Sequence, residues 1–377
     1  MDIDSSNNKD GTGTFSSNLI GALKKNHEVD LFFYPDDANK QFFIKKYARR
    51  FIQKLIRLKT KTYFDPFYEW FILPKYISRD GLDIYHSIGS IVPKKAACIT
   101  IQTCLDLAFY YHPHYLPTPL IRYYNKFVKA SVENANHIIA ISESTKNDLI
   151  KIWNIPENKI TTIHLGVDIE KYSNRTMSKD EFQVLTGVFS EYLLFVGNLN
   201  ARKNVIRLVK AFSHVVTIFP ELKLVLVGSS GEEENKLRIL VGELKLENKI
   251  LLMGRVTIDI LVAYYQNAKV FCYPSLYEGF GLPILEAMAA GTPVLTSNTS
   301  SMSEISGEAA VLIDPLDIVS ISEGIVNVLN RRDELVAKGF EHVRGYTWEI
   351  TAEKTFNLYK KLMLEKNGTT SIKCIDL

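Results

Sequence analysis

The sequence predicts an α/β protein made of two doubly wound, parallel-sheet domains that face each other across a cleft. Its 377 residues exceed the usual size of a single domain. Short apolar runs rich in β-branched residues recur along the chain, and a turn and a helical pattern follow most of them. This repetition of strand, turn and helix is typical of Rossmann-like parallel sheets covered by helices on both faces.

The second half of the chain carries the more regular pattern. Helical patterns occupy residues 204–219, 232–246 and 258–268. The expected strands of this half are residues 192–197, 222–228, 249–254, 269–274, 292–297 and 309–314. These apolar runs are much shorter than the roughly 20 residues that cross a membrane, so they are typical of buried parallel strands.

The first half repeats the pattern less regularly. Its expected strands are residues 1–4, 28–35, 83–89, 98–104, 137–142 and 159–166. The polar stretch 166–182 is typical of a linker, and a last helical pattern covers residues 347–364. We therefore divide the chain into a first domain (1–168), a second domain (169–346) and a closing segment of helix and tail (347–377).

The composition is that of an ordinary globular protein, with 46% apolar residues, 23% charged residues and a net charge of +3. This balance gives no reason to expect a nucleic-acid partner. The four cysteines lack metal-type spacing, so we expect reduced thiols in a cytoplasmic protein. No apolar run follows a basic N-terminus, so no signal peptide is expected.

The most informative stretch is EGFGLPILEAMAAGTPV, residues 278–294. Pro283 suits the first turn of a helix, where its missing N–H would have no partner, and Gly291 suits the end of that helix. Free N–H groups at the helix start, together with the helix dipole, predict an anion site. Gly279 and Gly281 would let a bulky ligand approach the backbone.

Two carboxylates flank this turn: Glu278 precedes it and Glu286 lies inside the helix. Carboxylate oxygens accept hydrogen bonds from paired hydroxyl groups. A nucleotide sugar, with phosphates in the middle and hydroxyls at both ends, fits both features. The spacing alone is uninformative, because Glu341 and Glu349 repeat it without the glycines.

A basic pair follows the first strand of the second half. Lys203, with Arg202 beside it, comes after strand 192–197 and before a helix, which places it at the carboxyl end of the sheet. A positive charge there would stabilise a departing diphosphate. The alternative is a solvated pair at a helix start, a position that the helix dipole disfavours unless an anion is present.

The stretch 278–294 resembles the signature of the retaining nucleotide-sugar glycosyltransferases of family 4 (glycosyl transferases group 1), which have the GT-B fold. Other segments resemble further parts of that family in the same order along the chain: residues 11–23, 141–149, 163–172, 196–205, 301–307 and Trp348. The resemblance implies that the first domain serves the acceptor and the second binds the nucleotide sugar. It also implies a last helix that crosses back onto the first domain.

The resemblance implies roles for individual residues. Lys203, with Arg202, would bind the donor phosphates. Glu278 and the backbone of Phe280 and Gly281 would hold the donor sugar, and Glu286 the ribose hydroxyls. Four further residues would complete the donor site: Gly11 and Gly13 approach the diphosphate from the first domain, and Arg255 and Val256 contact the base.

Two positions depart from the family pattern. Asn198 replaces an arginine found in many relatives, so Arg202 would supply that phosphate contact. Leu105 and Asp106 stand where many relatives have His-Asp, so Asp106 or His112 would have to take over any catalytic role of that histidine. The alternatives are a core or capping role for Asp106 and an ordinary loop position for His112.

No metal ion and no cofactor beyond the nucleotide-sugar donor are expected. The resembling fold needs no metal, and the family is generally thought to use front-face attack, in which the donor phosphate takes the acceptor proton. Asp2 and Asp4 form a D-x-D pattern, but at a strand start rather than in a metal loop.

Residues 42–61 hold eight Lys/Arg and no acid, with apolar residues at helical spacing on the other face. We expect this helix to contact an anionic membrane surface. The alternative is a first-domain helix with a solvated charged face.

The sequence therefore predicts a retaining, metal-independent hexosyltransferase that moves a hexose, with mannose as a candidate, from a nucleoside-diphosphate sugar to a lipid-linked or polysaccharide acceptor. It would work in the cytoplasm, peripherally at the inner face of a membrane. A GT-B nucleotide-sugar epimerase and a non-catalytic nucleotide-sugar-binding protein are the alternatives.

Overall fold

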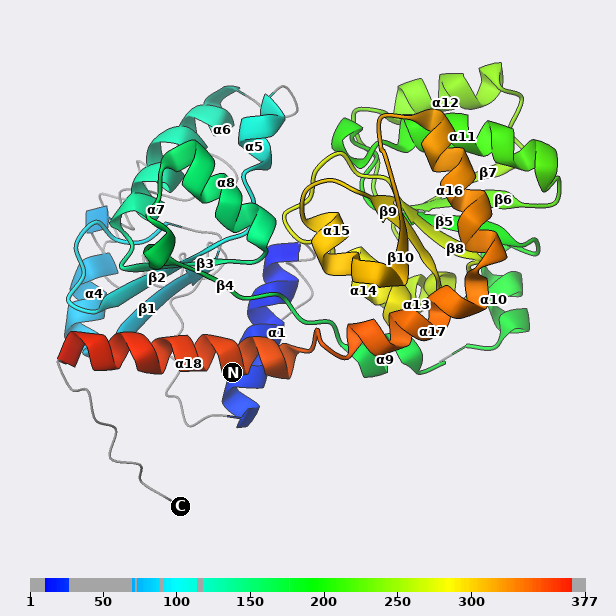
Figure 1. Ribbon diagram of the computed structural model, residues 1–377. Helices are drawn as coiled ribbons and strands as arrows, with labels where there is room; N and C mark the ends of the chain where they lie inside the picture. Colours follow the sequence, from blue (N-terminus) through cyan, green and yellow to red (C-terminus); the bar gives the residue numbers. More distant parts are fainter. Residues whose placement is uncertain are drawn as a thin grey trace, which may run out of the picture.

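The computed structural model describes residues 11–26, 70–71, 73–88, 91–113, 118–175 and 177–367. Figure 1 shows two lobes side by side, each with a sheet flanked by helices. The expected strands 1–4 and 28–35 and the basic stretch 42–61 lie outside the described residues. The predicted architecture of two parallel-sheet domains is confirmed.

The first sheet has four parallel strands in the order β1-β2-β3-β4. Each matches a strand predicted from the sequence: β1 (Ile84–Ile88), β2 (Ile99–Cys104), β3 (His137–Ala140) and β4 (Ile160–Thr162). The described helices of this lobe are α1 (Gly11–Asn26), α4 (Leu73–Asp80), α5 (Ala108–Tyr111), α6 (Thr118–Tyr123), α7 (Lys129–Asn134) and α8 (Glu143–Trp153).

The second sheet has six parallel strands in the order β10-β9-β8-β5-β6-β7. All six match predicted strands: β5 (Tyr192–Val196), β6 (Lys223–Val227), β7 (Ile250–Gly254), β8 (Val270–Tyr273), β9 (Val294–Ser297) and β10 (Ala310–Ile313). The order reverses between β5 and β8, which lie next to each other. Such a switch point is where doubly wound sheets bind ligands, at the carboxyl ends of the strands.

Helices cover both faces of the second sheet. They are α9 (Ile169–Ser173), α10 (Lys179–Thr186), α11 (Val205–Ile218), α12 (Glu234–Glu243), α13 (Ile258–Asn267), α14 (Leu282–Ala289), α15 (Ser301–Ser306), α16 (Ile318–Asn330) and α17 (Arg332–Val343). The stretch expected to be a linker is thus partly helical. Ser178 and Glu181 form a capping box that starts α10 within it.

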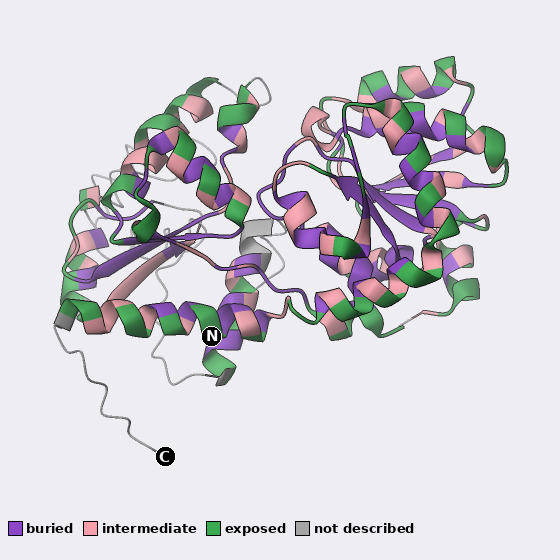
Figure 2. Ribbon diagram, in the orientation of Figure 1, coloured by how far each residue is buried: buried purple, intermediate pink, exposed green. Residues whose placement is uncertain are grey.

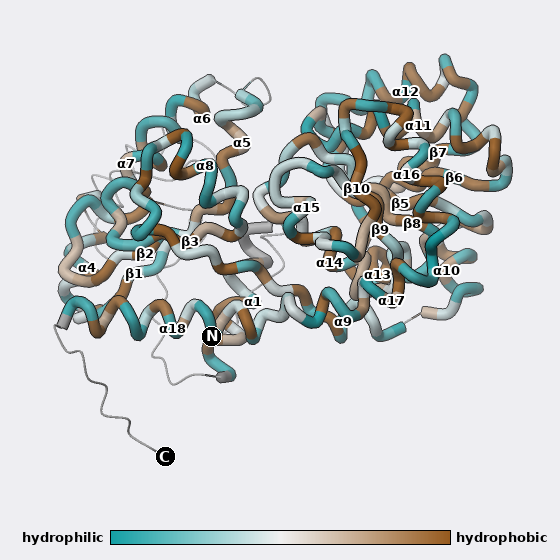
Figure 3. Tube along the Cα trace, in the orientation of Figure 1, coloured by the Kyte–Doolittle hydropathy of each residue, from teal (hydrophilic) through white to brown (hydrophobic). Residues whose placement is uncertain are grey.

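The core of the second domain lies in two layers, one on each face of the sheet. Along β5, Leu194 packs into one layer, and Leu193 and Phe195 into the other. Because successive side chains point to opposite faces, burial of both faces explains a continuous apolar run. Figure 2 shows the strands buried and the outer helix faces exposed, and Figure 3 shows hydrophobic residues concentrated in the same strands.

The last helix, α18 (Trp348–Asn367), runs along the first lobe (Figure 1). Trp348 stacks on Phe15 of α1 at 5.9 Å between ring centroids, and Leu358 packs against strand β2. The start of α18 lies close to the backbone at Gly166, where a Cβ atom would lie 2.2 Å from the backbone nitrogen of Trp348. Helix α18 therefore lies against the first lobe, and the division of the chain at 168 and 346 remains a prediction.

Candidate active site

The switch point between β5 and β8 brings the main predicted residues together. The loop after β5 carries Arg202 and Lys203, and the loop after β8 carries Glu278. Asn204 joins the two loops, because its side-chain amide donates to the carbonyls of Pro274 (3.0 Å) and Pro315 (2.6 Å). Two segments about 70 residues apart in sequence thus meet because parallel strands end at one edge of the sheet.

Glu278 is bound by both neighbouring cations. Lys203 Nζ donates to Glu278 Oε1 and Arg202 Nη1 to Glu278 Oε2, each at 2.7 Å. Arg202 Nη1 also donates to the Tyr277 carbonyl at 2.7 Å, and Lys203 Nζ to the Tyr273 hydroxyl. We name Arg202, Lys203 and Glu278 the basic–acid cluster.

The ionisation of this cluster follows from burial and pairing. Burial alone would raise the pKa of Glu278, but Lys203 and Arg202 outweigh it and lower that pKa to about 2. Burial lowers the pKa of Lys203, although Glu278 opposes the shift. Burial lowers the pKa of Arg202, but Glu278, Tyr273 and Asp106 together outweigh burial and raise that pKa. Two cations therefore share one carboxylate, an arrangement that favours an added anion.

Asp106 approaches this cluster from the first domain. Its Oδ1 accepts from the Ala108 N–H at 2.9 Å, so it caps the short helix α5. Burial raises the pKa of its carboxyl group. The charge of Glu278 also raises this pKa, whereas the charges of Arg202 and Lys203 oppose the shift. The capping role is present in the structure, and the catalytic role remains a prediction. His112 lies nearby, with its ring 6.1 Å from the ring of Tyr277.

The loop between β8 and α14 touches the first domain directly. A Cβ atom on Gly279 would lie 2.1 Å from the Leu105 carbonyl oxygen and 2.7 Å from the Asp106 Cβ. The close approach predicted for a ligand at Gly279 is thus made here by the other domain. The carboxyl ends of both sheets face this contact, because Leu105 follows β2 and Gly279 lies beyond β8.

Helix α14 begins and ends as its residues predict. Gly281 precedes it with φ of 108°, Pro283 lies in its first turn, and Gly291 follows it with φ of 74°. The Phe280 side chain is buried in the core, which leaves its backbone for the predicted contact with the donor sugar.

Sequence reasoning missed two serines that hold this loop. Ser300 Oγ accepts from the Glu278 N–H at 3.0 Å, and Ser301 Oγ donates to the carbonyls of Glu278 and Phe280 at 2.8 Å each. The only available signal was their position just before or in the motif at 301–307, at the start of α15.

Glu286 lies apart from the basic–acid cluster. Its Oε2 accepts from the Tyr265 hydroxyl at 2.9 Å, and Tyr172 is also a hydrogen-bonding neighbour. Burial raises the pKa of Glu286, although both tyrosines and Lys171 oppose the shift. The structure therefore gives the two predicted glutamates different partners, and the ribose role of Glu286 remains a prediction.

The other predicted donor contacts lie at strand or helix ends. Asn198 follows β5 and accepts from the Ser229 hydroxyl, and Arg255 is exposed just beyond β7, next to Val256, which packs against the core. The resemblance implies that Gly11 and Gly13 approach the donor diphosphate from the first domain. In the structure both lie in helix α1 (Gly11–Asn26), and their contact with the donor diphosphate remains a prediction.

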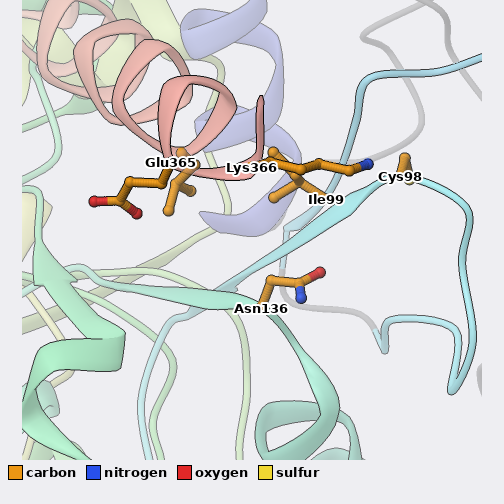
Figure 4. A pocket seen from close by; sticks show the side chains of 6 residues that line it. Cys98, Ile99, Asn136, Glu365 and Lys366 are labelled. Atoms are coloured by element: carbon orange, nitrogen blue, oxygen red, sulfur yellow. The ribbon is translucent and has the colours of Figure 1, made fainter. Parts of the chain in front are cut away.

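A separate groove of about 290 Å³ lies at the amino end of the first sheet (Figure 4). Its lining residues are Cys98, Ile99, Asn136, Leu362, Glu365 and Lys366. Lys366 Nζ donates there to the Ala97 carbonyl at 3.3 Å. The basic–acid cluster lies beyond the carboxyl ends of strands, so this groove is not part of it.

The described residues have neither a metal-binding group of side chains nor a membrane-spanning helix. They contain no group of three His, Cys, Asp or Glu side chains that could hold a metal ion. Within the same part of the chain, every helix is too short or too polar to cross a bilayer.

Comparisons with known proteins identify the family of this chain. Residues 9–171 match the family described as "Glycosyltransferase Family 4", and residues 178–339 match "Glycosyl transferases group 1". The chain is 32% identical over 291 residues to the O-antigen chain mannosyltransferase B of Escherichia coli, covering 75% of this chain and 76% of that protein. It is 24% identical over 330 residues to the O-antigen chain mannosyltransferase RfbU of Salmonella typhimurium, covering 85% and 88%.

Solved structures share the fold. Anabaena Alr3699/HepE in complex with UDP and glucose superposes with a TM-score of 0.68 at 16% identity, covering 95% of this chain and 98% of that one. The sucrose-phosphate synthase of Thermosynechococcus elongatus gives a TM-score of 0.62 at 22% identity, with 78% and 77% covered.

Proposed function

The chain belongs to glycosyltransferase family 4, the glycosyl transferases group 1, and from this premise we propose that it transfers mannose from a nucleoside-diphosphate sugar to a polysaccharide or lipid-linked acceptor. The transfer retains the anomeric configuration and uses no metal. The single observation that carries the proposal is the basic–acid cluster at the switch point of the second sheet.

The cluster supplies the charge that this reaction needs. A departing diphosphate develops negative charge, and a preorganised cation stabilises it most where water is excluded. Lys203 and Arg202 are held in place by Glu278 and by the Tyr277 carbonyl, which are groups of the protein itself. They need little reorganisation when the sugar–phosphate bond breaks.

The same geometry bears on retention. A double displacement would need a free carboxylate to attack the sugar. Both oxygens of Glu278 are bound by cations, which weakens it as a nucleophile. This favours a front-face reaction in which the donor phosphate accepts the proton of the acceptor hydroxyl.

Two kinds of support bear on the substrates. The relatives named O-antigen chain mannosyltransferases favour mannose as the sugar and a growing polysaccharide as the acceptor. A structural neighbour was solved with UDP and glucose, so the nucleotide base has to be tested separately.

A donor panel tests the proposal. Purified protein is incubated with GDP-mannose, UDP-glucose or UDP-N-acetylglucosamine, with and without a synthetic lipid-linked mannose oligosaccharide, and nucleoside diphosphate release is measured. We expect release from GDP-mannose that depends on the oligosaccharide. Conversion of a donor without acceptor would indicate an epimerase, and binding without turnover would indicate a non-catalytic protein.

The site of action is part of the proposal. We place the protein in the cytoplasm, peripherally at the inner membrane face, through residues 42–61, whose eight Lys/Arg favour anionic lipid. Flotation with phosphatidylglycerol vesicles, compared with phosphatidylcholine vesicles, tests it. Salt-sensitive binding to the anionic vesicles alone is expected, and equal recovery with both would contradict it.

A further inference from the structure

Helix α8 of the first domain contacts the second domain at three points. Asp148 Oδ2 accepts from the Tyr277 hydroxyl at 2.7 Å. Ser142, which caps the helix, donates from Oγ to the Gly279 carbonyl at 2.8 Å. The Glu304 carboxylate accepts from the first free N–H groups of the helix, those of residues 143 and 144, at 2.8 and 3.2 Å.

Two of these contacts lie on either side of Glu278. Tyr277 precedes it and Gly279 follows it, so the first domain binds the Tyr277 side chain before this carboxylate and the Gly279 backbone carbonyl after it. Tyr277 also contacts Arg202, because the Tyr277 carbonyl accepts a hydrogen bond from Arg202 Nη1 at 2.7 Å. A shift of Tyr277 would therefore move both the carboxylate and one cation of the basic–acid cluster.

Asp148 is suited to hold Tyr277 in place by its burial and its hydrogen-bond partners. Asp148 is only 8% exposed. One carboxylate oxygen accepts from the hydroxyl of Tyr277 in the second domain at 2.7 Å, and the other accepts from the hydroxyl of Tyr111 in the first domain at 2.6 Å. The pKa of each tyrosine is raised, by burial first and then by nearby carboxylates including Asp148, so both remain donors at neutral pH.

Separation of the domains would change this arrangement. Asp148 would keep the hydroxyl of Tyr111 and lose that of Tyr277. In this structure the bond from Tyr277 satisfies that carboxylate oxygen, and so it stabilises the contact between the domains.

We propose that Asp148 is a positioning residue that, through the Tyr277 hydroxyl, fixes Glu278 and Arg202 in their catalytic places only when the two domains meet. The inference rests on the proposed function, because it gives the transferase a cluster that the acceptor-side domain completes. Placement matters here, since a misplacement of about 1 Å can lower a rate about 100-fold.

A matched pair of tyrosine variants tests the proposal. Tyr277→Phe removes the hydroxyl that donates to Asp148 and accepts from the Leu107 N–H, both in the first domain. Tyr111→Phe removes only the bond within the first domain to the same carboxylate. We expect Tyr277→Phe to lower kcat about 10-fold or more, as for loss of a hydrogen bond to a charged group, with little change in KM for GDP-mannose. Tyr111→Phe should stay within about 3-fold of wild type.

Changes at Asp148 sharpen the test. Asp148→Ala removes the bonds to both tyrosines, so it should lower kcat at least as far as Tyr277→Phe. The loss in the double variant should be smaller than the product of the two single losses, because the two changes share the bond between Asp148 and Tyr277. Asp148→Asn keeps one acceptor oxygen and should recover part of the rate. A wild-type kcat for Tyr277→Phe, or an equal loss for Tyr111→Phe, would overturn the proposal.

Hydrogen exchange gives a readout that does not depend on activity. The Leu107 N–H donates to the Tyr277 hydroxyl at 3.3 Å, and the loop at 276–281 lies beside it. Amides of both segments should exchange faster in Tyr277→Phe than in wild type and Tyr111→Phe. If wild type fails to transfer any sugar, the proposed function falls and this exchange alone decides the inference; unchanged exchange would refute it.

Discussion

Glu278 and Glu286 belong to one sequence motif but lie in opposite electrostatic settings. Glu278 is bound by two cations at the contact between the domains, and its pKa is lowered to about 2. Glu286 lies within the second domain beside the hydroxyls of Tyr265 and Tyr172, and burial raises its pKa. The comparison teaches that partners, not motif position, decide what a carboxylate does.

The difference suggests a division of labour. A carboxylate bound to cations sets the position and charge of those cations. A carboxylate surrounded by hydroxyls accepts hydrogen bonds and can exchange one hydroxyl partner for another. Glu278 would then act on the chemical step, and Glu286 on donor binding through the ribose.

The largest expected effect is at Lys203, which together with Arg202 would bind the diphosphate of the donor. Lys203→Ala should lower the rate of GDP release from GDP-mannose about 10²–10³-fold, because it removes charge that stabilises the leaving group. Lys210→Ala, an exposed lysine on α11, is the control and should match wild type. A Lys203→Ala enzyme as fast as the control would remove the cluster from the mechanism.

The next effect separates the two glutamates by kinetics. Glu278→Gln should lower kcat about 100-fold, because the amide no longer organises both cations, while KM for the donor changes little. Glu286→Gln should instead raise that KM about 10-fold with a smaller change in kcat, through weaker ground-state binding. Steady-state kinetics with GDP-mannose measure both constants. The same changes in kcat and KM in the two variants would contradict the different roles of the two glutamates.

The smallest effects concern stability, and they have opposite signs. The folded-state pKa of Glu278 lies below the unfolded value of 4.5, so its contribution is present above pH 4.5 and is lost as pH falls toward 2. Glu278→Gln should therefore melt at a lower temperature than wild type at neutral pH, by about 2–4 °C per kcal/mol lost. This gap should narrow below pH 4.5.

Glu286 behaves in the opposite way. Its folded-state pKa is raised, so its contribution is present below the unfolded value of 4.5 and is lost as pH rises through the folded-state pKa. Glu286→Gln should then melt above wild type at pH 7, and the gap should close on acidification. Thermal melts of wild type and both variants from pH 7 to 4 check these two predictions. If the melting temperatures of both variants differ from wild type in the same direction at pH 7, the assigned environments are contradicted.

The sequence was sufficient for what depends on local pattern. Every expected strand in the described residues is present, because a buried parallel strand shows itself as a short apolar run. Lys203 and Glu278 could be brought together in advance, since both follow strands and carboxyl ends of parallel strands share an edge.

Contacts between distant residues could not be predicted in this way. Asp148 and Tyr277 are 129 residues apart, and neither periodicity nor spacing connects them. Gly279 was interpreted through a ligand, but its missing side chain also admits the backbone at Leu105. The partners of Glu286, Tyr265 and Tyr172, come from two other helices whose packing the local pattern does not specify.

The central claim is that the basic–acid cluster binds the diphosphate of the donor. Calorimetric titration of GDP, and separately of UDP, into wild type, Lys203→Ala and Lys210→Ala tests it most directly. We predict that Lys203→Ala binds the preferred nucleotide about 10-fold or more weakly, while Lys210→Ala binds it as wild type does. Equal affinity in all three proteins would contradict the account.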